Sequence, residues 1–596
     1  MTMTRRDLLK LGLLGAGTTA VGLGLPFGQS ASTADWISTL PVAKRPQPYT
    51  RPFVPAPRLP YRELTDADGP YRLYTVTERM GVASIIDGLP TPVMGYGFQG
   101  LDGQPRLSVP GPVISVPQGT RVKFRVKNAL PATHPQWAYP LDTSTHLHGS
   151  ASLPQYDGYA DDITAPGQYK DYWYANFQAA RTLWYHDHAV HHTAKNAYSG
   201  LVAQYHLHDA AELDLLPQGR YDVPLTISDA MFAADGTLAY QDRNFSGLWG
   251  DVILVNGVPW PVMQVQRRVY RFRILTTTLS RSFTLRLVNV ATGQQVPVHV
   301  VATDGGLMPK SQQVGSWRQA GAERYEILVD FGQFTSLPAG SKFQLRNTSA
   351  ANNVDFLHTG KVMEFRLSNE PVTDTRHNTI PGTLVNSAIM GLTAAESRRT
   401  RRMELKHDDI TNEFNINQST WHDVQASGFT KIVDGVGTPP QPGDVELWVI
   451  ENTSGGWFHP MHLHLADFKI LSRTGGAGRV QPYEQGPKDT VYTGEGETIR
   501  ILAKYDMVKA EHTVTDPMTR QPYTYRTGKA GATGSAGGRY MIHCHNLPHE
   551  DHDMMQQYQV GSTPGINDPR LAAPALPLPA DGVFDDGAEV LADKVQ

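Results

Sequence analysis

The chain of 596 residues contains a single cysteine, and it lies between two histidines in His543-Cys544-His545. His549 follows five positions after this cysteine, and Met554 follows ten positions after it. One thiolate, two imidazoles and a weak thioether donor are the ligands of a blue-copper electron-transfer centre. Because successive side chains of a strand point to opposite faces, Cys544 can bind one metal while the flanking histidines face others. A free buried cysteine among unrelated histidines is the alternative.

Three other segments also contain paired histidines, which makes that alternative weak. They are His146-Leu147-His148, His186-Asp187-His188 and His462-Leu463-His464. Histidines two positions apart share one face of a strand and suit a shared site. His459 is three positions before His462, so in an extended chain it faces the other way, although Pro460 can bend the strand. The segments before and after the long middle stretch must therefore fold against each other, and the shared site should lie at their interface, where cofactor sites are common.

The number of histidines indicates copper. The four pairs supply eight imidazoles, enough for three ions with two or three each, and His459, Cys544, His549 and Met554 remain for a fourth. Zinc is the natural competitor. Structural zinc sites favour several thiolates, so eight imidazoles with one remote thiolate suit copper better.

These segments resemble the signatures of the multicopper oxidases, and most closely those of bilirubin oxidases and bacterial spore-coat laccases. The resemblance rests on His146 to Ser150 with Asp157-Gly158, Trp184 to His188, Trp457 to Pro460, and His543 to Leu547 running on to Met555. Between them, Trp249 to Val252, Val255 to Gly257, Tyr270 to Arg273 and Ala322 to Glu326 resemble the family's middle domain. The similarity covers roughly residues 50 to 562.

The resemblance implies four copper ions. The type 1 ligands it implies are His459, Cys544, His549 and the long axial ligand Met554, chosen over Met555 by the family's spacing from the cysteine. The type 2 ligands are His146 and His462. The type 3 ligands are His148, His186 and His545 on one ion and His188, His464 and His543 on the other. An axial methionine implies a moderate type 1 potential.

The resemblance also implies roles for residues that bind no metal. Asp157 and Glu550 are implied to relay the protons that dioxygen reduction consumes; the alternatives are a turn residue at Asp157 and a solvated charge at Glu550. Trp457 is implied to line the substrate face, with a packing role equally open. Asp187 points away from its neighbouring ligands and is expected to orient nearby groups by hydrogen bonds. His191, His192, His206, His208 and His552 are expected to be structural.

Composition predicts an all-β protein. Charged residues make up only 18%, and 55 glycines and 43 prolines punctuate runs of β-branched and aromatic residues. The family fold is three consecutive cupredoxin-like Greek-key sandwiches. We expect them at 50–210, 220–368 and 401–561, with a linker at 369–400 and a weakly ordered tail at 562–596. A net charge of −4 without a basic stripe gives no reason to expect nucleic-acid binding.

The N-terminus predicts export. Thr4-Arg5-Arg6-Asp7-Leu8-Leu9-Lys10 is a twin-arginine pattern, followed by a glycine-interrupted apolar run from Leu11 to Phe27. Residues 1–33 are therefore expected to be a removable signal, with an uncleaved anchor as the alternative. The mature protein is expected to be periplasmic or secreted, to have no stable membrane span and to be a monomer.

Two segments depart from the family pattern. Residues 505–538 form a polar insertion, which could cover the type 1 site or be a mobile surface loop, and the second is favoured. Pro548 precedes His549 and is expected to stiffen a loop that carries this ligand.

The resemblance implies an oxidase that couples four one-electron oxidations to the reduction of dioxygen to water. Bilirubin, phenols and aromatic amines are the expected reductants, docking near an exposed imidazole edge of His459. A metallo-oxidase acting on cuprous, ferrous or manganous ions is the enzymatic alternative; the 16 methionines form no cluster of the kind cuprous oxidases carry. A copper-free scaffold relative is disfavoured because every ligand position is filled.

Overall fold

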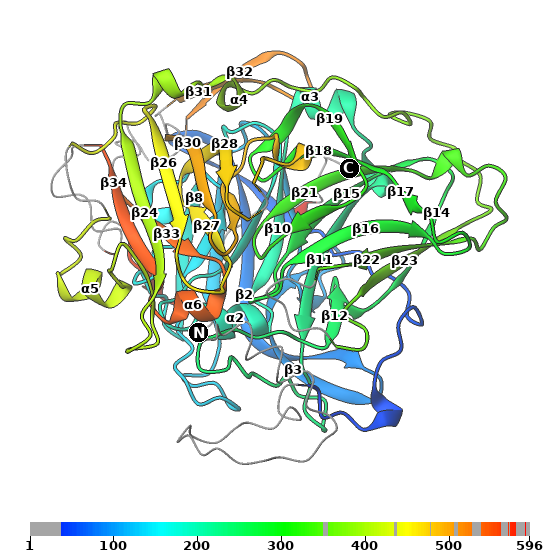
Figure 1. The fold of residues 1–596 in the computed structure, drawn as a ribbon, viewed down its shortest axis with the longest axis horizontal. Helices are drawn as coiled ribbons and strands as arrows, with labels where there is room; N and C mark the ends of the chain where they lie inside the picture. Colours follow the sequence, from blue (N-terminus) through cyan, green and yellow to red (C-terminus); the bar gives the residue numbers. More distant parts are fainter. Residues whose placement is uncertain are drawn as a thin grey trace, which may run out of the picture.

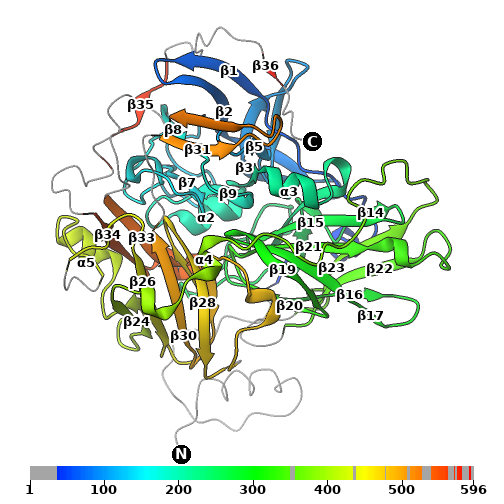
Figure 2. The same cartoon turned by 90° about the horizontal axis from the view of Figure 1, so that it is seen from above.

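The computed structural model describes residues 37–349, 356–433, 438–476, 478–505, 511–526, 538–561, 570, 573–579 and 590–591. Six large sheets pack in pairs into three sandwiches, which Figure 2 shows as three lobes coloured blue to cyan, green, and yellow to orange. The expectation of an all-β protein built from three cupredoxin-like sandwiches is confirmed. The expected signal at residues 1–33 lies outside the described residues. Within them, no helix is both long enough and apolar enough to cross a bilayer.

The first sandwich packs an eight-stranded sheet against a four-stranded sheet. The larger sheet contains β35 (Leu576–Pro577), β8 (Gln168–Tyr174), β6 (Val122–Asn128), β2 (Gly69–Ile86), β1 (Tyr61–Asp66) and β36 (Val590–Leu591), with β3 (Leu89–Gln99) and β4 (Pro105–Ser108) added beside β2. The smaller sheet runs β5 (Ile114–Pro117), β10 (Val202–His208), β9 (Arg181–Asp187) and β7 (Thr145–His148). Strands β35 and β36 belong to the tail after residue 561 and pair with β8 and β1.

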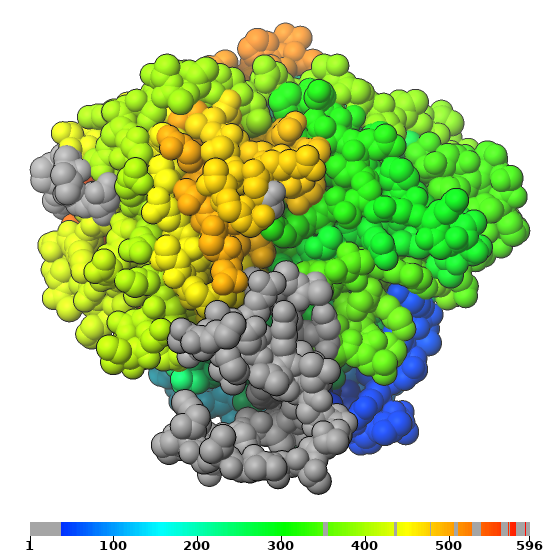
Figure 3. All heavy atoms as spheres, in the orientation of Figure 1, coloured from blue at the N-terminus to red at the C-terminus, as the bar shows by residue number. Residues whose placement is uncertain are grey.

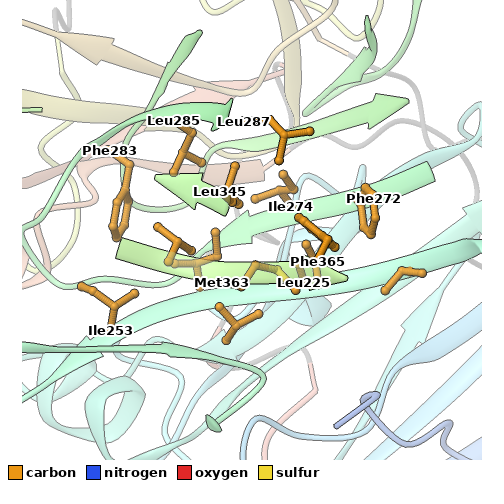
Figure 4. Packing of buried hydrophobic residues seen from close by; sticks show 14 of the residues in the cluster. Leu225, Ile253, Phe272, Ile274, Phe283, Leu285, Leu287, Leu345, Met363 and Phe365 are labelled. Carbon is orange, nitrogen blue, oxygen red and sulfur yellow. The ribbon is translucent and has the colours of Figure 1, made fainter. Parts of the chain in front are cut away.

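The second sandwich contributes the largest apolar core of the described residues, part of which Figure 4 shows. Its seven-stranded sheet runs β13 (Val258–Pro259), β12 (Val252–Val255), β11 (Asp222–Ala230), β15 (Val269–Thr276), β21 (Arg324–Asp330), β18 (Val298–Thr303) and β19 (Gly306–Val314). Its six-stranded sheet contains β14 (Val262–Val265), β23 (Lys361–Leu367), β22 (Lys342–Asn347), β16 (Phe283–Asn289), β17 (Gln295–Val296) and β20 (Trp317–Gln319). Phe272, Leu345 and Phe365 from the two sheets meet between them because alternate residues of each strand point inward.

The third sandwich carries the cysteine. One sheet runs β25 (Phe414–Ile416), β24 (Thr400–His407), β26 (Val445–Asn452), β30 (Thr498–Tyr505) and β28 (Ala466–Thr474). The other runs β29 (Thr490–Thr493), β27 (His459–Leu463), β33 (Gly538–Cys544) and β34 (Met555–Val560). Figure 1 places α6 (Leu547–Asp551) at the lower end of β33. Pro548 thus lies in the first turn of a short helix that carries His549, where proline is well tolerated, and not in a loop.

A parallel strand pair recurs in all three sandwiches. It joins β2 with β6, β11 with β15, and β24 with β26. The three domains therefore share a topological element although no repeat is visible in the sequence.

Short helices and one hairpin lie outside the sandwiches. The helices are α2 (Thr193–Ser199), α3 (Ala210–Leu215), α4 (Ala388–Gly391) and α5 (Trp421–Ala426). The described part of the 505–538 insertion is a hairpin of β31 (Glu511–Thr515) and β32 (Pro522–Arg526). His512 stacks on Phe177 with ring centroids 4.1 Å apart, and Arg520 pairs with Asp214. The hairpin therefore packs on the first domain, at the end of the molecule opposite α6 in Figure 1.

The domains meet in a continuous body. On the face seen in Figure 3, the yellow to orange third domain lies directly against the green second domain. The paired histidines lie where the first and third domains face each other, because β7 and β9 of the first domain and β27 and β33 of the third turn their histidines outward from their own cores.

Candidate metal centre

Two strand ladders set the positions of the paired histidines. In the first domain, His146 of β7 lies opposite His186 of β9. In the third domain, His462 of β27 lies opposite His543 of β33, and Met461 lies opposite Cys544. Directly opposed residues of an antiparallel pair have Cβ atoms about 4.5–5.5 Å apart, so each ladder delivers neighbouring imidazoles to one face.

The eight paired histidines converge from both domains into one buried cluster. His188 Nε2 and His464 Nε2 each lie 3.1 Å from His543 Nε2. His545 Nε2 lies 3.1 Å from His148 Nδ1, and His186 completes this second group. The third group holds His146 and His462, whose Nε2 atoms are 3.4 Å apart. His148 also lies within reach of His146 and His462, so the groups overlap, and the three ligand sets that the resemblance implied stay a prediction.

Hydrogen bonds fix which ring nitrogen faces into each group. His146 Nδ1 donates to the backbone carbonyl of Asp157, and His462 Nδ1 donates to that of Asp489 at 2.9 Å. His186 Nδ1 donates to the carbonyl of Asp187 at 2.8 Å. A neutral imidazole that donates through one nitrogen presents a lone pair on the other, which is the form that binds metals.

The cluster has the donor chemistry of a copper site. Burial lowers the pKa of six of these imidazoles well below the ordinary range, and neighbouring imidazoles lower it further; the six are His146, His148, His186, His462, His464 and His545. The pKa of His188 falls to about 4 for the same reason. Neutral lone pairs therefore face one another at contact distance. Within the described part of the chain, the buried Nε2 of His186 makes no hydrogen bond. A cation in each group would satisfy these nitrogens, and imidazole suits copper.

A second cluster surrounds the cysteine on the other face of β33. His459 Nδ1 lies 3.3 Å from Cys544 Sγ, and His549 Nδ1 lies 3.9 Å from the same sulfur. The opposite orientation of His459 and of the paired histidines, expected from strand alternation, is therefore present. Burial raises the pKa of the Cys544 thiol well above its ordinary value, so a thiolate here needs an adjacent cation.

The two adjacent methionines belong to different clusters. Met554 is fully buried in the apolar cluster that contains Cys544. Met555 packs with Trp421 and Phe429 in another cluster. This packing favours Met554 over Met555 as the axial ligand.

The expectation of an exposed imidazole edge is wrong. His459 and His549 are both 0% exposed. Phe414 stacks on His549 with ring centroids 3.8 Å apart, and the half-buried Trp457 meets the His549 ring edge-on at 5.6 Å. Trp457 thus lies beside the type 1 cluster, as expected, but together with Phe414 it covers the imidazoles.

Both predicted relay carboxylates lie beside paired histidines. Asp157 Oδ2 accepts a hydrogen bond from His464 Nδ1 at 2.6 Å. Glu550 Oε2 lies 2.7 Å from His543 Nδ1, and Glu550 Oε1 lies 3.6 Å from His188 Nδ1. Burial raises the pKa of Asp157 well above its ordinary value. Burial also acts to raise the pKa of Glu550, but His543 and His188 lower it overall.

The remaining singled-out residues lie outside the three groups. Asp187 accepts hydrogen bonds from Ser144 and Asn196 and so braces the strand that carries its neighbours. The histidines expected to be structural contact other groups: His208 contacts Ser115 and Glu212, His206 contacts Gln204, and His191 contacts the Asp551 carbonyl. The His192 ring lies tilted against Tyr139, and the His552 ring stacks on Phe245.

Three residues of the site escaped sequence reasoning. Asp489 Oδ1 accepts from His148 Nε2 at 3.0 Å, and Arg324 of the middle domain pairs with Asp489. Phe414 covers His549. None lies within a histidine motif, so the local sequence held no signal for them; Arg324 drew attention only as part of the middle-domain resemblance.

Two family models, both described as multicopper oxidase, match residues 106–211 and 402–510. The chain is 36% identical over 466 residues to a bilirubin oxidase from Albifimbria verrucaria, covering 76% of this chain and 72% of that protein. It is 31% identical over 523 residues to a laccase from Bacillus subtilis (strain 168), covering 79% of this chain and 90% of that protein.

Solved structures show the same fold. The McoA multicopper oxidase of the hyperthermophile Aquifex aeolicus superimposes with a TM-score of 0.68 at 25% identity, covering 87% of this chain and 100% of that one. The chain belongs to the multicopper oxidase family and is an oxidoreductase that takes four copper ions and uses dioxygen as its electron acceptor.

Proposed function

We propose that the protein oxidises small aromatic reductants of the bilirubin, phenol and aromatic amine class. The type 1 site would be held by His459, Cys544, His549 and Met554, and the type 2 and type 3 sites by the eight paired histidines. The observation that carries this proposal is the placement of Cys544 and its two neighbours on opposite faces of β33, in contact with two separate donor clusters. Copper held by these residues would supply one-electron redox chemistry at the type 1 site and a site where dioxygen is reduced with four electrons and four protons to two water molecules.

The chain itself supplies the connection between the two sites. The thiolate of Cys544 is joined through its own backbone to His543 and His545, so a covalent path leads from the sulfur to both type 3 groups. Phe414, Trp457 and the surrounding apolar cluster keep water from the thiolate and the two imidazoles. Because water is excluded and the ligands are held in place, the ligands and the solvent would rearrange less when an electron is transferred at this site.

Asp157 and Glu550 are proposed to hold and move protons beside the type 3 histidines. Their carboxylates reach His464 Nδ1 and His543 Nδ1, within hydrogen-bond distance. The same contacts orient the two imidazoles so that their Nε2 atoms face the cluster.

A cleft of about 670 Å³ next to the type 1 cluster is the proposed docking site. Its titratable lining residues are Lys406, Asp408, Glu413, His422, Asp423 and Asp553. Glu413 flanks Phe414, whose ring stacks on His549, and Asp553 directly precedes Met554. Four carboxylates line the cleft with Lys406, and Lys431 pairs with Asp423 at 3.2 Å. The carboxylates outnumber the lysines and attract positively charged donors, so cationic aromatic amines fit this cleft better than a tetrapyrrole dicarboxylate.

The same carboxylates make ferrous and manganous ions the second candidate substrates, since oxygen ligands suit such cations. Oxygen-uptake rates with an aromatic diamine, bilirubin and ferrous ion would separate the two proposals. A high rate with ferrous ion and a negligible rate with both organic donors would reverse the ranking.

Export by the twin-arginine route, a periplasmic or secreted mature protein and a monomeric state complete the proposal. Export is supported by the pattern at residues 4–10. The N-terminus and mass of the protein recovered outside the cytoplasm test them.

Replacement of the only thiolate tests the electron path. Cys544→Ser is expected to abolish the blue absorption and oxygen uptake with every reductant, because a hydroxyl is a poor copper ligand and breaks the path from the type 1 site. Visible spectra and oxygen uptake of the copper-loaded proteins measure this. Retained activity in the serine variant contradicts the proposed path.

The adjacent methionines offer a matched pair for the axial ligand. Met554→Leu is expected to raise the type 1 reduction potential, because loss of a thioether donor destabilises the oxidised ion more than the reduced one. Met555→Leu should leave the potential at the wild-type value. Redox titration of the blue band measures both, and a shift confined to Met555→Leu would transfer the axial role to that residue.

The proton-relay proposal predicts an effect on the dioxygen half of the reaction. Glu550→Gln and Asp157→Asn remove an acid of similar shape and should slow reoxidation by roughly 10²–10⁴-fold, the range of general acid catalysis. The rate at which the blue band bleaches under anaerobic reductant should stay near the wild-type rate. Stopped-flow spectroscopy separates the two half-reactions, and unchanged reoxidation in both variants rules the relay out.

Charge in the cleft should affect donor specificity. Neutralising it with Glu413→Gln and Asp423→Asn together is expected to lower kcat/KM for a cationic aromatic diamine and to weaken its salt dependence, because screening removes the same attraction. Glu63→Gln, an exposed change on β1 of the first domain, is the matched control. An equal loss with an anionic aromatic donor would contradict docking by charge.

A further inference from the structure

The second domain contributes no residue to the histidine groups described above, yet one of its side chains binds a carboxylate that contacts them. Arg324, at the start of β21, is 0% exposed. Its NH1 donates to Asp489 Oδ1 at 2.8 Å and its NH2 donates to Asp489 Oδ2, forming a two-pronged pair. Such paired contacts fix the orientation of the carboxylate as well as its position.

Asp489, which directly precedes β29 of the third domain, contacts His148 of the first domain and His462 of its own domain. Its Oδ1 accepts from His148 Nε2 at 3.0 Å, and its backbone carbonyl accepts from His462 Nδ1 at 2.9 Å. The rings of His148 and His462 stack with centroids 3.6 Å apart. Asp489 therefore favours one inward nitrogen on each ring, Nδ1 of His148 and Nε2 of His462. The Thr490 hydroxyl supports the same orientation, since it lies 3.0 Å from His148 Nε2 and 3.4 Å from His462 Nδ1.

Neighbouring residues restrict the positions of Arg324 and Asp489. Asp304 Oδ1 accepts from the Arg324 backbone N at 2.6 Å, and Lys488 Nζ lies 2.9 Å from Asp304 Oδ2. A Cβ added at Gly149 would lie 2.5 Å from Asp489 Oδ2 and 2.7 Å from Arg324 NH2. The chain next to His148 therefore approaches the pair so closely that only glycine fits there.

A purely stabilising ion pair would explain the burial of Arg324 but not the geometry around Asp489. Elsewhere in the protein, the buried Arg401 pairs with Glu446 at 2.9 Å through NH2 and at 3.1 Å through Nε. No contact of that pair reaches a histidine among the described residues, whereas the Arg324 pair reaches two. The two ion pairs therefore differ in one respect: the acidic residue bound by Arg324 also accepts hydrogen bonds from histidines.

We propose that Arg324 is a positioning residue for the trinuclear copper site, acting through Asp489 to orient His148 of the first domain and His462 of the third. This inference rests on the proposed assignment of those histidines as copper ligands. It gives the middle domain a direct part in assembling a site whose ligands all come from its two neighbours.

Copper-loaded Arg324→Met and Arg324→Lys proteins test the proposal, with Arg401→Lys as the matched control. Arg324→Met should weaken retention of type 2 and type 3 copper by about 10- to 100-fold, measured as copper transfer to a chelator. Its type 2 electron paramagnetic resonance signal should change shape, while the blue type 1 band is retained. Arg324→Lys keeps the positive charge but cannot make the two-pronged contact with Asp489, so its loss of copper retention should be intermediate.

The outcomes separate this inference from the proposed function. Wild-type copper retention and an unaltered type 2 signal in Arg324→Met would overturn the inference, as would equal changes in Arg401→Lys. If Arg324→Met does not accumulate, Arg324→Lys and Asp489→Asn are measured as two separate variants. An unaltered type 2 signal in both of them would overturn the inference as well. A wild-type protein that lacks the blue band or four bound coppers would instead refute the ligand assignment itself.

Discussion

The pairing of β27 with β33 is the constraint on which the rest of the site depends. Met461 opposite Cys544 and His462 opposite His543 are consecutive pairs of the same ladder, so the first pair faces the apolar core beside the type 1 cluster and the second faces the paired histidines. A slip of one residue in this register would exchange the two faces and bury the imidazoles in the apolar core. The core residues Met461, Leu463 and Ile542 therefore hold the register that separates the thiolate from its neighbouring imidazoles.

The type 1 site and the histidine cluster need different surroundings, and side chains from the end of β33 point into both. On the cysteine side, Phe414 and the apolar cluster exclude water from a soft ligand set. On the histidine side, carbonyls and carboxylates accept from the Nδ1 atoms of His146, His186, His462 and His464, and Asp489 accepts from His148 Nε2 instead. This second environment is mostly polar, although Trp184 stacks on His186, and it depends on contacts between domains.

Full burial of His459 and His549 changes how a reductant must approach. Electrons have to enter through the residues that cover the imidazoles, and Phe414 is the side chain in closest ring contact with His549. The carboxylate-lined cleft lies on the other face of the strand that carries Phe414. Donor preference would then reflect the charge of a surface that shares no ligand with the copper site.

The sequence by itself determined the ligand types, their pairing and the all-β class, because strand alternation and donor chemistry are local properties that the H-x-H and H-C-H spacings express. It also indicated Asp157, Glu550 and Trp457 through their place in recognisable motifs. Only the tertiary structure decided the burial of His459 and His549, the cover formed by Phe414, and the path from Arg324 through Asp489 to His148. Those features join residues that are far apart in the chain, and their geometry depends on how three separately packed domains dock, which no local spacing encodes.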